Sequence, residues 1–267
     1  MKNLMLLFAL AISFVSCSND ETPITQEPSP RLEKVIVFKN TANEQTWNFS
    51  ATGQLYECLN NAGQRIESYT YNDKNQVTSW SKYTNGAVTA TYNFTYNAAG
   101  IVSKINTTDI TFNTNTGNYS YTNNGITREV TLNADRMATF VKETNGTATT
   151  NYQMLYTAGN LMSFARTSTS SNFTKNYSYN TSATYKTNLG VMIAPVALIK
   201  SFMEPDFLAN GFTSISVPEA SQNGNPAALR YEYGAIPSER AMLFIGEEFV
   251  NNNPGNLTSY QEYYYAN

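Results

Sequence analysis

The chain has 267 residues, a formal net charge of −3 at pH 7 and charged side chains at only 14% of its positions, where soluble domains have roughly 25%. A small negative charge excludes the basic surface that nucleic-acid binding needs, and the absence of histidine excludes Ser-His-Asp and Cys-His catalysis and His-ligated zinc. Uncharged polar residues, chiefly Thr, Asn, Ser and Tyr, are abundant instead of charged ones. Because these residues favour strands and turns over helices, the composition predicts an all-β fold.

The first seventeen residues are typical of an export signal. Lys2 supplies a positive charge, the stretch from Leu4 to Phe14 is almost wholly apolar, and the small residue Ser16 stands directly before Cys17. The apolar stretch is shorter than the roughly 20 residues that a membrane-spanning helix needs. The pattern resembles the lipobox of bacterial lipoproteins, which implies a signal peptide over 1–16 and a lipid on Cys17. An ordinary cleaved signal followed by a chance cysteine is the alternative.

Residues 17–30 read as a lipid-anchored tether. They contain the acidic pair Asp20-Glu21 and three prolines, with no apolar period, which is typical of an extended, solvated linker. An acidic cluster after an acylated cysteine resembles the signal that takes some Gram-negative lipoproteins to the outer face of the outer membrane. The resemblance implies a lipid-anchored, surface-exposed outer-membrane protein. A linker that happens to be acidic is the alternative, and a periplasmic orientation stays open.

An aromatic-polar-aromatic segment followed by a turn recurs along the next part of the chain. The second aromatic position falls at residues 49, 71, 96, 121, 156 and 179, and residues 130–135 look like half a repeat in the longest gap. The alternation predicts a strand with one buried face, and Asn-x-x-Gly predicts a tight turn. Asn85-Gly86 and Asn145-Gly146 then predict hairpin turns. Each repeat is expected to be one hairpin, and successive hairpins an antiparallel meander.

The repeat unit, Tyr-x-Tyr-Asn-x-x-Gly-x-Val/Leu, resembles the YD repeats of RHS-type proteins, with Tyr-Asn in place of Tyr-Asp. Together with the lipobox it makes the chain similar to a family of secreted bacterial lipoproteins of unknown function with a porin-like sheet. The resemblance covers about residues 32–185. It implies a β-sheet fold, and it supplies no catalytic residues, because none are assigned in that family.

Residues 186–267 break the repeat pattern. The apolar run from Gly190 to Met203 contains Pro195 and predicts a helical or irregular insert against the sheet, whereas 231–233, 242–245 and 260–265 return to strand character. The sequence therefore predicts a single all-β domain over 31–267. In it, an antiparallel meander of hairpin repeats, at about 32–185, forms a curled sheet or barrel. A short insert lies near 190–210, and 186–267 close the sheet.

No group of residues predicts catalysis, a metal or a cofactor. Glu247 and Glu248 are adjacent, but neighbouring residues of a strand point to opposite faces. Four other carboxylates are scattered along the chain: Asp206, Glu219, Glu232 and Glu239. Cys58 is expected to be a small core residue.

Trp47 and Trp80 are the speculative ligand-binding residues, because exposed aromatic rings stack on sugars. Packing of the aromatics in the core of the sheet is the alternative. An exposed pair would favour glycan binding, and burial of both tryptophans would remove its simplest form.

The leading prediction for function is a lipid-anchored, non-enzymatic binding or structural module of the cell envelope. A surface glycan-binding lipoprotein beside a polysaccharide-uptake system is the alternative, and a hydrolase that uses scattered carboxylates ranks last. The expected partners are the membrane, through the lipid anchor, and a glycan or another envelope protein. Nucleic acid is excluded.

Overall fold

A computed structural model describes residues 31–39, 41–179, 189–210, 212–214, 218–223, 228–236, 241–250 and 253–265, and over 218–260 it describes the backbone alone. The first strands in chain order are β1 (Leu32–Lys39), β2 (Gln45–Phe49), β3 (Leu55–Asn60), β4 (Arg65–Tyr71), β5 (Val77–Thr84), β6 (Ala87–Tyr96), β7 (Val102–Ile105) and β8 (Thr108–Asp109). They are followed by β9 (Thr111–Asn113), β10 (Asn118–Asn123), β11 (Ile126–Leu132), β12 (Ala138–Asn145), β13 (Ala148–Thr157), β14 (Asn160–Ser168) and β15 (Asn172–Tyr179).

A helical segment interrupts the strands at this point. It consists of the α-helix α1 (Leu189–Met203) and the 3-10 helix η1 (Pro205–Asn210). The chain then returns to strands with β16 (Pro218–Asn223), β17 (Ala228–Ile236), β18 (Ala241–Val250) and β19 (Asn253–Tyr265). This order confirms the all-β prediction with a helical insert near 190–210.

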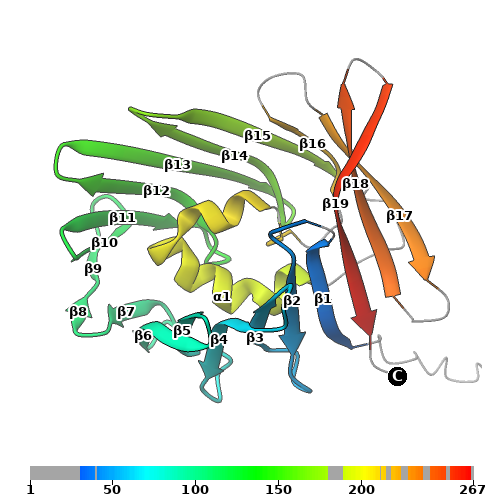
Figure 1. Ribbon diagram of the computed structural model, residues 1–267. Helices are drawn as coiled ribbons and strands as arrows, with labels where there is room; N and C mark the ends of the chain where they lie inside the picture. The colour runs from blue at the N-terminus through cyan, green and yellow to red at the C-terminus, as the bar shows by residue number, and fades with distance from the viewer. Residues whose placement is uncertain are drawn as a thin grey trace, which may run out of the picture.

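Neighbours in the sequence are neighbours in the sheet. From β1 to β8, and again from β9 to β19, each strand pairs antiparallel with the next. β19 also pairs with β1, where Val35 lies opposite Tyr263. The pairing therefore runs from β9 through β19 to β1 and on to β8, and the sheet curls around α1 (Figure 1). The predicted meander of hairpins is confirmed.

The repeated asparagine builds the turn between two strands. The side-chain Oδ1 of Asn72 accepts hydrogen bonds from the backbone N–H groups of Lys74 and Gln76, each at 3.0 Å. This local bonding is the reason why asparagine favours turns. The fourth turn position has a left-handed backbone, with φ of 57° at Asn75 and 73° at Gly100. The turns at 50–54, 72–76, 97–101, 133–137 and 157–160 share one end of the sheet, the repeat-turn end.

A β-bulge follows the repeat turns. In β5, Tyr71 pairs with Val77 and Thr70 with Ser79, so that Thr78 is the extra residue. Because of the bulge, two residues that lie three positions apart in the sequence both point inward. Strict alternation would place them on opposite faces of the sheet. The buried pairs made this way are Leu55/Cys58, Val77/Trp80, Val102/Ile105, Ala138/Val141 and Leu161/Phe164.

The second aromatic of a repeat connects it to the repeat before. Tyr71 Oη donates a hydrogen bond to the carbonyl of Leu55 at 2.6 Å, and Tyr96 Oη donates to the carbonyl of Val77 at 2.7 Å. Tyr179 Oη makes the same 2.6 Å contact with Leu161. The hydroxyl group explains why tyrosine recurs at this position, because it donates a hydrogen bond to a backbone carbonyl beside the bulge.

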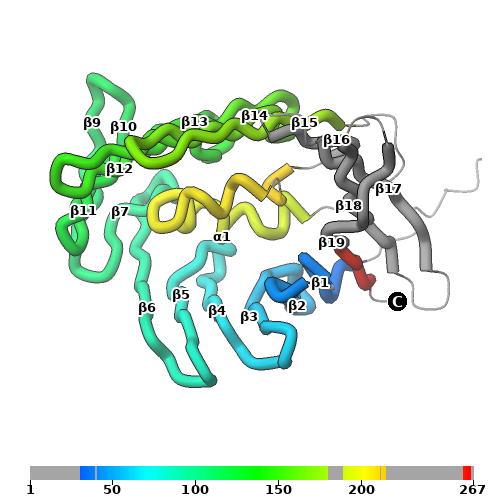
Figure 2. Tube along the Cα trace, turned by 45° about the horizontal axis from the view of Figure 1, so that its top comes forward, coloured from blue at the N-terminus to red at the C-terminus, as the bar shows by residue number. Residues whose placement is uncertain are grey.

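The helix α1 lies inside the curl and completes the core (Figure 2). In both views it lies between β11–β14 on one side and β3–β6 on the other. A helix that is apolar all round is typically buried, and Ile193, Val196, Ile199 and Phe202 have no exposed surface. Each such side chain contributes about 1.5–3 kcal/mol by leaving water. Among the described residues, no helix is long and apolar enough to cross a membrane.

Candidate functional site

The two ends of α1 are held to the sheet by different contacts. At its N-terminal end, a Cβ built on Gly190 would lie 2.4 Å from the carbonyl oxygen of Ser214, so that only glycine permits this approach. Ser214 Oγ in turn accepts a 3.0 Å hydrogen bond from the backbone N–H of Leu161. At the C-terminal end, the contacts are ionic.

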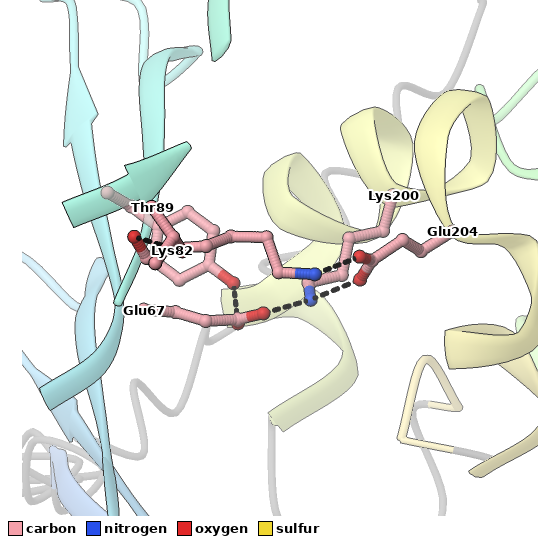
Figure 3. A network of polar contacts seen from close by, with 6 residues as sticks. Glu67, Lys82, Thr89, Lys200 and Glu204 are labelled. Atoms are coloured by element: carbon pink, nitrogen blue, oxygen red, sulfur yellow. Dashed lines mark hydrogen bonds and ion pairs between the residues drawn. The ribbon is translucent and has the colours of Figure 1, made fainter. Parts of the chain in front are cut away.

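Lys200 of α1 is the centre of a buried ionic network (Figure 3). Its side chain is 5% exposed, and its Nζ lies 2.8 Å from Glu67 Oε1 and 3.4 Å from Glu204 Oε2. Glu204 also pairs with Lys82 of β5, and Glu67 accepts a hydrogen bond from the hydroxyl of Tyr69. Strands β4 and β5 are thus joined to α1 through four charged side chains.

Aromatic rings surround the same ammonium group. Lys200 Nζ lies 4.5 Å from the ring centroid of Trp80 and 4.8 Å from that of Phe207. Desolvated cation–π contacts of this kind contribute about 2 kcal/mol. Trp80 therefore packs against the ionic network, fully buried.

A hydrogen bond from Tyr121, beside an ion pair within the sheet, joins α1 to the opposite wall. Arg128 Nη2 lies 2.6 Å from Glu143 Oε2, and Arg128 Nη1 donates to Tyr121 Oη at 3.4 Å. The Tyr121 hydroxyl donates to the carbonyl of Phe202 at the end of the helix. Burial raises the pKa of Tyr121, so that it stays a hydrogen-bond donor at neutral pH.

The inner pocket lies beside these contacts, at the C-terminal end of α1. It has a volume of about 570 Å³ and its lining includes Trp47, Tyr152 and Phe207. The carboxylates in its wall are all paired with a base: Glu67 and Glu204 with Lys200, Glu143 with Arg128, and Asp206 with Arg166 at 3.5 Å. The Lys200–Glu67 and Arg166–Asp206 pairs join the helical segment to the sheet, whereas the Arg128–Glu143 pair lies within the sheet.

The two least buried of these carboxylates differ in acidity. Burial opposes the ionisation of Glu204, but Lys200 and Lys82 outweigh burial and hold its pKa below the ordinary value. Burial raises the pKa of Asp206, and Arg166 offsets part of that rise. Glu204 is therefore the ionised partner of two lysines. This arrangement suits a structural role better than a role in proton transfer.

The end cavity is the second hollow, at the N-terminal half of α1. It has a volume of about 460 Å³ and lies between the helix and the turns of the repeat-turn end. Its apolar lining includes Ala194 and Leu198 of α1, Met137, Ala138 and Tyr156. A mostly apolar hollow of this size, with a few polar groups, is typical of small-molecule sites.

Charged side chains edge the end cavity. Lys74, Asp135 and Arg136 line it, are exposed, and make no ion pair with another described residue. A polar hollow of about 560 Å³, the vestibule, adjoins it and shares Lys74 and Arg136. The described residues contain no group of three or more His, Cys, Asp or Glu placed to hold a metal.

The predicted ligand residues are both in the core. Trp47 is 3% exposed and Trp80 is 0% exposed, so that the prediction of exposed rings for sugar stacking is wrong. Trp47 stacks on Phe207 with ring centroids 6.1 Å apart, and Trp80 occupies the inward bulge position of its repeat. Cys17 lies outside the described residues. Cys58 is buried in the core as predicted.

The scattered carboxylates of the sequence do not form a described cluster. Asp206 is the one that reaches a hollow, the inner pocket. Glu219, Glu232, Glu247 and Glu248 lie in strands whose side chains are not described, and residue 239 lies outside the described residues.

Sequence reasoning missed the residues at the edge of the end cavity. The signal was present, because Asn133-Ala134-Asp135-Arg136-Met137 matches the turn Asn72–Gln76 position by position, with arginine at the left-handed place. The structure confirms the turn: Met137 N–H donates to Asn133 Oδ1 at 2.9 Å, and Arg136 has a φ of 62°. The half repeat is therefore a repeat turn.

Comparison with known proteins identifies no family. No family model matches the chain, and no curated protein matches it. The similar solved structures include a porin-like protein from Bacteroides uniformis ATCC 8492 (11% identity, 90% of this chain and 98% of that chain covered, TM-score 0.36). They also include a porin-like protein from Bacteroides vulgatus ATCC 8482 (9% identity, 89% of this chain and 99% of that chain covered, TM-score 0.38). Likeness at this level does not extend to function, and the relation to YD repeats and lipoproteins stays a prediction.

Proposed function

We propose that the chain is a non-enzymatic binding module, held at the outer membrane by a lipid on Cys17, and that its ligand occupies the end cavity. The observation that carries the proposal is the cavity itself: about 460 Å³ of mostly apolar space edged by charged side chains. Their charge is not used in an ion pair within the described part of the chain.

The inner pocket supports a role without catalysis. Acid–base chemistry needs a carboxyl group free to exchange a proton with substrate. The carboxylates of the inner pocket are instead each within 3.5 Å of a lysine or arginine. This arrangement stabilises the position of α1, and so it supports a structural role for the charged interior.

The position of the N-terminal segment supports the anchored arrangement. Arg31 Nη1 donates a 3.2 Å hydrogen bond to the carbonyl of Ala51 in the turn between β2 and β3. A Cβ built on Gly53 of that turn would lie 3.4 Å from Met192 of α1. The tether to Cys17 would therefore join the sheet at the repeat-turn end, the end that holds the cavity.

Filling the cavity tests the binding proposal. Ala194 is an exposed residue of the lining, so that Ala194→Trp would occupy the space without disturbing the buried face of α1. Val88→Trp, at a 56% exposed position of β6 outside the cavity, is the matched control. In a screen of lipids, peptides and glycans, we expect ligands of the wild type to be lost in the first variant and kept in the second. A ligand bound equally by both variants, or a screen without ligands, would contradict the proposal.

The anchor has its own test. Cys17→Ala removes the site of acylation, and we expect the variant to move from the membrane fraction to the soluble fraction. Unchanged partitioning would refute the lipid anchor and leave the cavity proposal untouched. Protease accessibility of the wild type on intact cells tests surface exposure.

A further inference from the structure

We propose that the ligand of the end cavity is a single-chain anionic amphiphile, of which a long-chain fatty acid is the simplest. This inference rests on the proposed function and names the chemical class of its ligand. It follows from two adjoining hollows of different polarity and from the cations at their junction.

The end cavity supplies the apolar compartment. Its wall combines Ala194, Pro195 and Leu198 of α1 with Leu208 of η1 and Tyr156 of β13. Tyr156 stays a neutral phenol, because burial raises its pKa. A hydrocarbon chain transferred from water to such a wall gains free energy with each methylene that it buries.

The vestibule supplies the polar compartment. It lies between the turns at 72–76 and 97–101, and its lining includes Asn72, Asn97 and Thr95. The two hollows have in common Lys74, Gln76, Tyr96, Gly100 and Arg136. A molecule with an apolar chain and a polar head therefore fits with its head at this junction.

The charges at the junction favour an anionic head. Lys74 and Arg136 border both hollows, whereas Asp73 borders the vestibule alone and Asp135 the cavity alone. Neither cation forms an ion pair with another described residue. A carboxylate at the junction would meet both cations, and arginine is well shaped to bind it through two parallel hydrogen bonds.

The backbone at Arg136 indicates that turn stability does not account for this residue. Its φ of 62° is in the left-handed region, which disfavours side chains other than those of Asn and Asp. The equivalent positions of other turns have Gly53, Asn75 and Gly100. A Cβ built on Gly100 would lie 2.7 Å from Arg136 Nη1, so that the absence of a side chain there gives the guanidinium its place at the junction.

The test uses cis-parinaric acid, a fluorescent fatty acid, and its uncharged methyl ester as probes. Both are titrated onto the full chain carrying Cys17→Ala, in which no attached acyl chain competes. We expect saturable binding of the acid, about tenfold tighter than that of the ester, which is the factor expected for one charge-assisted hydrogen bond. Equal binding of acid and ester would overturn the inference.

Arg136→Asn separates recognition from folding. It places at this turn the residue that Asn75 supplies at the equivalent position, so that thermal stability should stay equal or rise. We expect acid binding to weaken about tenfold and ester binding to stay unchanged. Lys104→Gln, which removes a half-buried cation of β7 that pairs with Asp109 and lies outside both hollows, is the charge control. An unchanged affinity of Arg136→Asn for the acid would refute the role of the guanidinium.

Three further outcomes separate the levels of the proposal. Binding that Ala194→Trp abolishes, but that does not distinguish acid from ester, would leave the proposed function standing and overturn the ligand class. Absence of any binding in the cavity would overturn both. If the acylated chain bound no probe while Cys17→Ala did, the anchor's own acyl chain would be the occupant, and the free ligand would be refuted.

Discussion

Breaking the buried contact between Lys200 and Glu67 should destabilise the fold strongly. At 2.8 Å, the attraction between the two charges is about 6 kcal/mol at an effective dielectric constant of about 20. The cost of desolvation opposes this term, and Glu204 at 3.4 Å stays as a second partner for Lys200. We therefore expect Glu67→Gln and Lys200→Met each to cost about 3 kcal/mol, the lower end of the range for breaking a buried pair.

A double-mutant cycle measures the coupling directly. Urea unfolding can be followed by tryptophan fluorescence, because Trp47 and Trp80 are both buried in the folded chain. Because each single variant leaves the other charge without its nearest partner, the double variant Glu67→Gln/Lys200→Met should cost clearly less than the sum, by about 2 kcal/mol. Additive effects within about 0.5 kcal/mol would refute the idea that the pair acts as a unit.

Three further predictions concern packing, backbone and pH. Gly190→Ala should cost about 2–3 kcal/mol in unfolding free energy, because its Cβ would lie 2.4 Å from the carbonyl oxygen of Ser214. Ala158→Asn should stabilise the fold by about 1 kcal/mol, because Ala158 has a φ of 47°, a left-handed backbone that Asn85 adopts in a similar turn. Burial lowers the pKa of Lys175 to about 8. The unfolded chain therefore binds more protons above pH 8, and stability should rise between about pH 8 and pH 10.

Each of these three predictions has a measurable outcome that would contradict it. A thermal midpoint for Gly190→Ala equal to the wild type would show that the chain around 212–214 can move away. A lower midpoint for Ala158→Asn would show that the turn needs the small side chain. The Lys175→Met variant should lose the rise with pH, and an unchanged slope in urea midpoints from pH 7.5 to 9.5 would assign the rise to another group.

The repeat made the strands and turns predictable, but not the face on which every residue lies. Alternation places Trp47 and Phe49 together, and both are buried. Strict alternation would separate Val77 from Trp80, and the bulge at Thr78 brings both inward. The inward position of Trp80 therefore could not be predicted from alternation, because a bulge is a property of strand pairing that one strand's sequence does not show.

The end cavity could be predicted only in part. The turn that presents Arg136 follows from its match with Asn72–Gln76. The hollow itself depends on where α1 enters the curl, and that depends on the close approach of Gly190 to Ser214. Nothing in the local pattern of either residue indicates a contact across 24 positions, so that the cavity appears only when the packing is known.

The position of α1 has a consequence for synthesis. In the described part of the chain, fifteen strands precede the helix, and their inward face presents side chains such as Trp80, Phe164 and Val141 that α1 and its neighbours cover. A growing chain therefore carries an uncovered apolar surface until residues 189–210 arrive, a condition that favours aggregation. Open repeat arrays can gain or lose units one at a time. Here the described repeats curl around α1, so that the gain or loss of a repeat would also change the space that the helix fills.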